Sequence, residues 1–380
     1  MMASMTHRER VLAALDHRDP DRTPIDFGGT YTTTIFYAAY ERLKQYLDLE
    51  HETAILSKTR RLAIPDESVL RRFDVDTRFL GLGVYEGDQR EIDEDTYLDE
   101  WGTTWRKAQD GHYLYVDGPF FDDKNPDPSA VADYRWPDPD NPGYIRGLGD
   151  RARALRENTD CAIVLNLPIG VIHQGQFLRG FADWLKDLYK HREFVCALMD
   201  MTADAWIRLA ENALDATGDN VDVVFFGDDL GSQLAPMFAP QIYRELIKPR
   251  HRRMIAAVKS RRDVKVLYHS CGAISTLIDD LIDIGVDAVN PVQITAKDMA
   301  PDDLKQEFGD RITFWGGINS QETLPFGTPG DVRGEVRRMI DCMGAGGGFV
   351  LNSVHNIQND VSAENIVAMF DEARSYRPGR

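Results

Sequence analysis

The residues best suited to chemistry in this sequence are a histidine and a cysteine with a single residue between them, His269 and Cys271. They follow Val264–Leu267, a run rich in β-branched and apolar residues that predicts a β-strand. Side chains two residues apart on a strand point to the same face, so the imidazole and the thiol should reach one space. Both groups are good zinc ligands. The alternative is a hydrogen-bonded histidine beside a buried cysteine.

The elements that position this pair are eight short apolar runs that alternate with segments of helical periodicity. Runs that are apolar throughout are typical of parallel strands buried on both faces. Eight such units predict an α/β fold of the (β/α)8 TIM-barrel type, with an open doubly wound sheet as the alternative. The runs are Thr23–Gly29, Thr77–Gly83, Cys161–Pro168, Val221–Asp229, Val264–Cys271, Val286–Gln293, Ile312–Asn319 and Gly348–His355.

Polar side chains stand where most of these runs stop, and in a barrel the carboxyl ends of all strands share one mouth. Two acidic residues are predicted to be catalytic, as a fourth metal ligand, a general base or groups that orient a ligand. They are Asp228 and Asp229. The alternative is that they cap the helix near Pro240. A second set is predicted to bind the substrate: Asp26, Asn166, Asn290, Gln293 and Asn352.

A third nitrogen ligand can join the pair at this mouth, because His355 closes the eighth run. Three protein ligands and one open position are typical of catalytic zinc rather than structural zinc. The prediction is therefore a zinc site made by His269, Cys271 and His355. The alternative for His355 is a hydrogen-bonded histidine of the pocket.

Residues 84–160 interrupt the alternation of strands and helices. Within them, Tyr97–Trp105 and His112–Val116 predict two antiparallel strands around a turn at Ala108–Gly111. The segment follows the second strand, on the side where barrel active sites open, so we expect it to roof the pocket. We predict one domain over residues 1–380, with this insertion and an N-terminal helix that begins at the capping box of Thr6 and Glu9.

The formal net charge of −18 argues against non-specific binding to nucleic acid and against an anionic membrane surface. The chain lacks an apolar run long enough to span a membrane, and its first residues lack the apolar core of a secretion signal. Its four cysteines are scattered, as reduced thiols are. We therefore expect a cytoplasmic protein.

Several segments resemble the uroporphyrinogen decarboxylase superfamily, and the resemblance covers essentially the whole chain. They are Arg8–Leu15 followed by Pro20–Pro24, His269–Gly272, Gly316–Ile318 and Val354–Gln358. The resemblance implies a TIM barrel, and a homodimer is an option because members are often dimers. The tetrapyrrole decarboxylases of this superfamily hold the carboxylates of their substrate with an arginine-rich N-terminal signature. Asp26–Tyr31 stands in its place here.

The chain more closely resembles the cobamide-dependent methyltransferases, which bind zinc through a His-x-Cys in strand five and a cysteine after strand eight. His269 and Cys271 match that pattern, and His355 replaces the last cysteine, which makes the site about one charge more positive. The resemblance implies zinc-dependent methyl transfer between a corrinoid (methylcobamide) and a small molecule, namely a thiol, a folate or a methyl ether.

The corrinoid is expected on a separate protein, because the D-x-H-x-x-G cobalamin motif is missing from the sequence. The alternatives are a metal-free decarboxylase of a tetrapyrrole and a non-catalytic protein that binds a corrinoid or tetrapyrrole.

Overall fold

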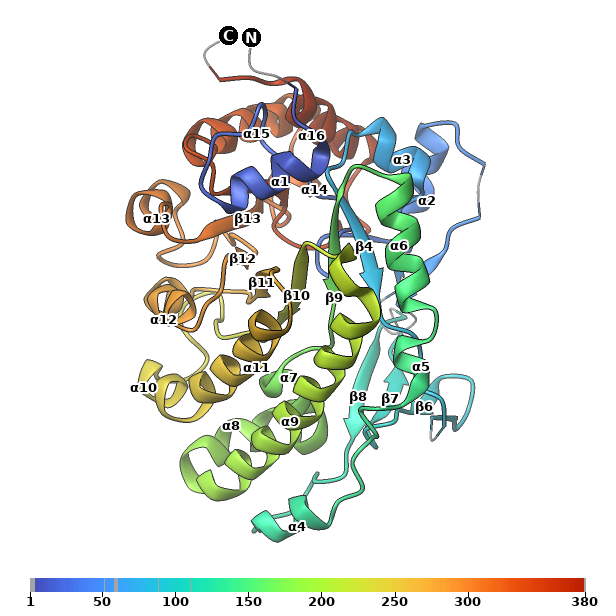
Figure 1. Cartoon of the computed structure of the whole chain (residues 1–380), viewed down its shortest axis with the longest axis vertical. Helices are drawn as coiled ribbons and strands as arrows, with labels where there is room; N and C mark the ends of the chain where they lie inside the picture. Colours follow the sequence, from blue (N-terminus) through green and yellow to red (C-terminus); the bar gives the residue numbers. More distant parts are fainter. Residues whose placement is uncertain (1–3, 51, 58–60, 88, 110, 379–380) are drawn as a thin grey trace.

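The computed structural model describes residues 4–378, except 51, 58–60, 88 and 110. Its centre is a curled parallel sheet of seven strands in the order β14-β13-β12-β11-β10-β9-β4 (Figure 1). Each strand falls within one of the predicted apolar runs. The bounds are β4 (Thr77–Gly81), β9 (Ala162–Asn166), β10 (Val223–Gly227), β11 (Lys265–His269), β12 (Ala288–Asn290), β13 (Thr313–Ile318) and β14 (Phe349–Ser353).

The first predicted strand occupies the eighth position, between the two edges of this sheet. Ile25 forms a parallel bridge with Leu351 in β14. On its other side, its carbonyl oxygen accepts a hydrogen bond of 2.8 Å from the N–H of Asp76, which leads into β4. The predicted TIM-barrel class is therefore confirmed.

Helices connect successive strands and cover the outside of the sheet, as parallel strands require. In Figure 1, α6, α9 and α11 lie along the outer face of β4, β9 and β10. The connecting helices are α6 (Leu148–Asn158), α9 (Arg192–Thr217), α11 (Lys248–Arg261), α12 (Ile278–Asp283), α13 (Pro301–Phe308), α15 (Pro329–Met343) and α16 (Ala363–Ser375). Shorter or additional helices are α2 (Tyr37–Tyr46), α3 (Glu67–Arg72), α4 (Pro128–Asp133), α5 (Pro142–Ile145), α7 (Val171–Arg179), α8 (Phe181–Lys190), α10 (Pro240–Ile242) and α14 (Thr323–Phe326).

Helix α1 (His7–Leu15) closes the amino end of the barrel. Its predicted capping box is present, with the Thr6 side chain accepting from the N–H of Glu9. The helix packs apolar residues against alternate, inward-facing residues of the strands, and these form a cluster separate from the core under the outer helices. The cluster holds Val11, Ala14, Leu15, Ala162, Val164, Val223, Phe225, Leu267, Ala288, Trp315 and Val350. The carboxyl end is therefore the end left for a ligand.

The segment predicted as an insertion holds a four-stranded antiparallel sheet in the order β5-β6-β7-β8. It lies at the lower right of Figure 1. The second predicted strand is present as β8, and it pairs with β7. The first prediction, one strand over Tyr97–Trp105, was wrong: that run is divided between β6 and β7, which pair with each other. Asp110, in the predicted turn, lies outside the described residues. The bounds are β5 (Arg90–Glu91), β6 (Thr96–Leu98), β7 (Thr104–Lys107) and β8 (Tyr113–Asp117). A further small sheet comprises β1 (Ile35–Phe36), β2 (Ile55–Ser57) and β3 (Leu62–Ala63).

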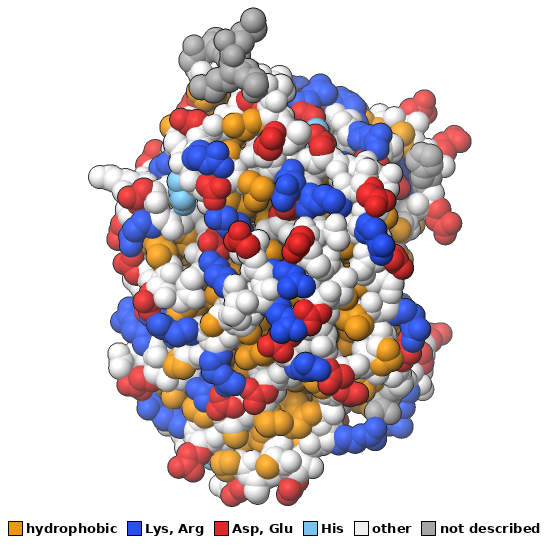
Figure 2. All heavy atoms as spheres, viewed as in Figure 1, with side chains coloured by type: hydrophobic (Ala, Val, Ile, Leu, Met, Phe, Trp, Pro, Cys, Tyr) orange, Lys and Arg blue, Asp and Glu red, His pale blue; other side chains and the backbone are white. Residues whose placement is uncertain are grey.

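The outer surface carries charges of both signs. Figure 2 shows basic side chains lying among acidic ones on the face formed by α9 and α11. Arg250 of α11, for example, pairs with Asp200 of α9 at 2.6 Å. Among the residues that the structure describes, none of the helices combines the length and the apolar character that crossing a membrane requires.

Candidate metal centre

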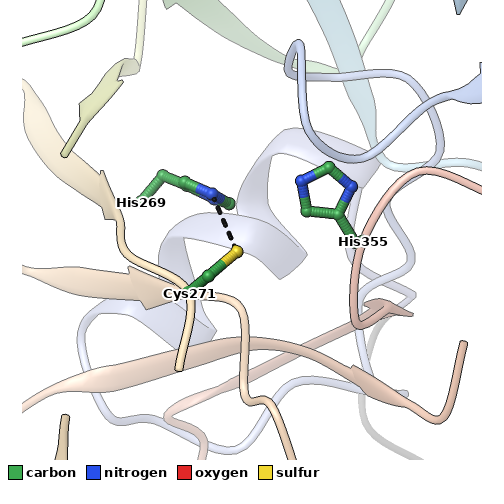
Figure 3. Close-up of side chains that lie close together, drawn as sticks. All are labelled: His269, Cys271 and His355. Atoms are coloured by element: carbon green, nitrogen blue, oxygen red, sulfur yellow. Dashed lines mark hydrogen bonds between the residues drawn. The ribbon is translucent and has the colours of Figure 1, made fainter. Parts of the chain in front are cut away.

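Three side chains with metal-binding donors converge at the carboxyl end of the barrel. His269 is the last residue of β11, and Cys271 follows two residues later. His355 comes two residues after the end of β14. One donor atom from each lies within 4.8 Å of the other two. Figure 3 shows His355 across from the other two residues, on a different segment of the chain. The structure therefore brings together all three residues that the sequence predicts as zinc ligands.

Hydrogen bonds fix which nitrogen of His269 is available. The side-chain amide of Asn290 donates to the carbonyl oxygen of Trp315 at 3.0 Å, which sets the orientation of the amide. Its oxygen therefore faces Nδ1 of His269 at 2.7 Å, and Nδ1 must be the donor. The lone pair of the neutral ring then lies on Nε2, which is 3.4 Å from Sγ of Cys271. A partner that holds the second ring nitrogen in this way is typical of histidines that ligate metals.

A cavity of about 560 Å³ opens beside the two histidines, His269 and His355. Its polar lining includes His269, His355, Asp229, Asn166 and His173. Aromatic residues complete the lining, and we call them the aromatic wall. It includes Tyr31, Phe36, Phe225, Phe226 and Tyr144. His112 and Tyr144 belong to the inserted segment, which agrees with its expected place over the pocket.

Asp229 is the acidic residue that reaches the cavity. Its carboxylate accepts the N–H of Cys271 at 2.8 Å and lies 3.6 Å from Nε2 of His269. Burial would raise the pKa of Asp229, but the hydrogen bond and charge of His173, the charge of His269 and the N–H of Cys271 together hold that pKa well below its usual range. Burial lowers the pKa of His173, but Asp228 and Asp229 outweigh it and raise that pKa to about 9.

Asp228 lies behind the cavity wall and is fully buried. Its carboxylate accepts the N–H groups of Ile172 and His173, at 3.1 and 2.9 Å, in the first turn of α7. It also contacts Nε2 of His251 at 2.9 Å. These contacts favour the helix-capping alternative for Asp228, although the helix is α7 rather than one near Pro240.

The residues predicted to bind substrate occupy two kinds of position. Asn166 borders the cavity, but its side chain is almost fully buried: its oxygen accepts the N–H of Tyr31 at 3.1 Å, and its amide donates to the carbonyl oxygen of Gly29 at 3.0 Å. Asp26, Asn290 and Asn352 are fully buried and hold the strand ends together. Asp26 accepts the indole N–H of Trp315 at 2.8 Å, and burial raises its pKa against the effect of its hydrogen bonds. Asn352 donates to the carbonyl oxygen of Asp26 at 2.7 Å.

Gln293 supports the loop that carries Cys271. Its side-chain oxygen accepts the N–H of Gly272 at 2.7 Å, and its amide donates to Gln233 at 2.8 Å. It therefore steadies the loop beside the metal-binding donors.

His173 is a residue of the cavity that sequence reasoning missed. It lies in the first turn of α7, the helix that follows β9. Its position in the sequence could have identified it, because the first helical turn after each barrel strand lies near the mouth of the barrel.

A second group of metal-binding side chains lies at the amino end of the barrel: His7, Asp160 and Cys161. Both ring nitrogens of His7 contact carboxylates, Asp160 at 2.8 Å and Asp74 at 2.9 Å. Burial raises the pKa of Cys161 to about 12, which disfavours the thiolate that a metal requires. The group at the carboxyl end is therefore the better candidate.

Comparisons with known proteins identify the family of the chain and proteins similar to it. Residues 116–376, more than half of the chain, match the family model described as uroporphyrinogen decarboxylase (URO-D). The uroporphyrinogen decarboxylase of Alkalilimnicola ehrlichii is 25% identical over 99% of this chain and 96% of its own length. The uroporphyrinogen decarboxylase of Methylococcus capsulatus is 25% identical over 50% of this chain. The chain spans about half, 51%, of the length of that relative.

Methyltransferases are also among the similar proteins. The methylcobamide:CoM methyltransferase MtbA of Methanosarcina mazei is 24% identical over 56% of this chain, and the chain spans 58% of that relative. A solved structure, a methyltransferase from Methanosarcina mazei, superimposes with a TM-score of 0.65 at 16% identity, over 97% of this chain and 98% of its own. That likeness supports the barrel fold.

Proposed function

This chain belongs to the uroporphyrinogen decarboxylase family, whose members are enzymes, and we propose that it is a zinc-dependent methyltransferase. The methyl group would move between a corrinoid (methylcobamide) and a thiol, a folate or a methyl ether. One observation carries the proposal: the donor atoms of His269, Cys271 and His355 converge within 4.8 Å at the mouth of the barrel. The similarity to a methylcobamide:CoM methyltransferase supports it.

The donor set fits zinc. One thiolate and two imidazoles are ligands that zinc prefers, and three protein ligands leave a position for substrate. Nε2 of His269 already presents its lone pair, because Asn290 holds the proton on Nδ1. Bound there, zinc would act as a Lewis acid on the sulfur, nitrogen or oxygen atom that gains or loses the methyl group.

The remaining residues would position the reactants and handle protons. Asp229 lines the cavity beside His269 and Cys271, so we propose that its carboxylate orients an incoming thiol or water by accepting a hydrogen bond from it. Asp228, also predicted to be catalytic, would act by holding α7, and with it His173, at the cavity wall.

Substrate contacts would come from both the barrel and the insertion. Asn166 lines the cavity, and we propose that it binds the substrate directly. Asp26, Asn290, Gln293 and Asn352 would act by holding the strand ends and loops around it. The aromatic wall excludes water from the reacting atoms. We also propose that the whole chain acts as one domain, and that a separate protein delivers the corrinoid at the open mouth.

Metal content tests the proposal. We expect close to one zinc per chain in protein purified without chelators, and loss of that zinc in the His269→Ala/Cys271→Ala double variant. His112→Ala, which changes the cavity wall without touching a ligand, should keep its zinc. Wild-type protein without stoichiometric metal would refute the proposed site.

Methyl transfer is tested separately, by following the absorbance of methylcobalamin with candidate thiols. A metal-free decarboxylase is the second candidate, because two relatives that the chain matches are uroporphyrinogen decarboxylases. Porphyrinogen turnover that survives removal of zinc would favour it. Tight binding of the macrocycle without either reaction would indicate a binding protein.

A further inference from the structure

The inserted sheet carries a row of aromatic side chains on one face. Tyr97 in β6 pairs across the ladder with Trp105 in β7, and Trp105 pairs with Tyr115 in β8. Cross-strand partners lie on the same face of a sheet. The rings of Tyr97 and Trp105 are nearly parallel, at 10°, with centroids 6.4 Å apart. The centroids of Trp105 and Tyr115 are 5.9 Å apart.

Phe177 of helix α7 and Tyr113 of β8 complete a concave aromatic surface. The ring of Phe177 lies 4.9 Å from both Trp105 and Tyr115, and Tyr113 lies 5.6 Å from Tyr97. A second cavity, of about 490 Å³, lies against these rings. We call this group of five rings the aromatic cage: Tyr97, Trp105, Tyr113, Tyr115 and Phe177. None of the five rings is fully buried, so each keeps part of its surface open.

Two carboxylates lie at the edge of the aromatic cage. The carboxylate of Asp99 accepts the indole N–H of Trp105 at 2.7 Å, and that of Glu100 accepts the hydroxyl of Tyr144 at 3.2 Å. Both residues line the cavity. Glu91 stands directly across the ladder from Tyr97. His173 borders the cavity as well, but its ring faces the carboxylates of Asp228 and Asp229 at 3.3 and 3.5 Å.

We propose that the aromatic cage binds a small organic cation of the quaternary or methylated ammonium class. The face of an aromatic ring carries negative potential and attracts a cation within about 6 Å of its centroid. The negative charges of the carboxylates at the edge attract the cation as well. A methylated ammonium ion also packs its methyl groups against the rings, which a metal ion or a hydrated ammonium does not do.

This site is separate from the proposed zinc centre. The cage is formed by β6, β7, β8 and α7, whereas the zinc donors follow β11 and β14. His173 is common to the linings of both cavities, so they adjoin each other. The proposal stands without the methyltransferase activity, and its test does not use that activity.

Calorimetric titration with choline chloride, at constant ionic strength, tests the proposal on the full chain. The control ligand is 3,3-dimethylbutan-1-ol, which has the shape of choline without its charge. We expect saturable binding of choline and binding of the neutral alcohol that is weaker by about tenfold or more. Equal binding of the two ligands would show an apolar pocket only and would overturn the proposal, as would no saturable binding of choline.

Variants then locate the binding site. Trp105→Ala should abolish choline binding, whereas Trp105→Phe, which keeps a ring at this position, should retain most of it. Glu100→Gln should weaken choline binding by several-fold without changing the affinity for the neutral alcohol. Tyr46→Ala, which removes an exposed aromatic ring of α2, should bind choline like the wild type.

The His269→Ala/Cys271→Ala variant separates the two cavities. It should bind choline as tightly as the wild type does; loss of binding there would place the cation in the barrel cavity and contradict the proposal. Thermal melting of each variant checks that it folds. If Trp105→Ala does not fold, retention of most choline binding in Trp105→Phe together with several-fold weaker binding in Glu100→Gln still supports the cage. Unchanged binding in Glu100→Gln overturns it.

Discussion

Removing the side-chain amide of Asn290 should weaken zinc binding without removing a zinc ligand. In the Asn290→Ala variant, Nδ1 of His269 loses the acceptor at 2.7 Å that holds its proton, so the ring is free to place the proton on Nε2 and to rotate. Loss of such a supporting partner typically weakens metal binding by about 10- to 100-fold. That factor corresponds to about 1.4–2.7 kcal/mol of binding free energy. Competition with a chromogenic zinc chelator at fixed pH measures it.

A matched control separates this effect from general loosening of the site. Thr32 donates to the same oxygen of Asn290 at 3.0 Å, so Thr32→Val removes a neighbouring hydrogen bond and leaves the contact with His269 in place. We expect this variant to bind zinc within about threefold of the wild type, because the loss of one neutral hydrogen bond costs only about 0.5–1.5 kcal/mol and falls on a residue that does not touch the metal. Zinc affinity of Asn290→Ala equal to the wild type, or an equal loss in Thr32→Val, would refute the reasoning.

Three further predictions concern the third ligand, the barrel interior and the amino end. His355→Cys should keep stoichiometric zinc and His355→Ala should bind it more weakly, because a thiolate is also a zinc ligand; metal analysis after dialysis distinguishes them. Trp315→Ala should destabilise the fold by about 3–5 kcal/mol in chemical denaturation, since it opens a cavity among fully buried residues. The hydrogen bond to Asp74 raises the pKa of His7 above 6.5, against the effect of burial, so its stabilisation is complete below pH 6.5 and is lost as the pH rises through the folded-state pKa. The difference in unfolding free energy between wild type and His7→Ala should therefore shrink above about pH 6.5, and a constant difference would contradict this account.

The barrel could be predicted from the sequence because its strands are buried on both faces. Their residues therefore form nearly continuous apolar runs. The convergence of His269, Cys271 and His355 followed from the same rule, since parallel strands end at one mouth. The roles of Asn290 and Asp228 could not be predicted in this way. Their side chains act through partners far away in the sequence, Trp315 and the first turn of α7, and spacing along the chain does not reveal such contacts.

The inserted segment was the least predictable part of the fold. Its strands β5 and β6 are only two and three residues long, too short for an alternation of apolar and polar residues to be recognised. The aromatic row on β6, β7 and β8 depends on the register of the ladder, which places Tyr97, Trp105 and Tyr115 side by side. Register is a property of paired strands, and a single run of sequence does not contain it.

Helix α1, which closes the barrel, also constrains the order in which the chain can assemble. The carbonyl oxygen of Ala14 accepts the N–H of Gly348 at 2.8 Å and contacts the hydroxyl of Thr313, 299 residues away along the chain. The apolar face of this first helix is therefore fully covered only when nearly the last strand has joined the earlier ones. Such distant contacts slow folding and leave apolar surface exposed in intermediates. Since His355 follows β14, the three donors of the candidate metal centre can converge only when the strand that also contacts this helix is in place.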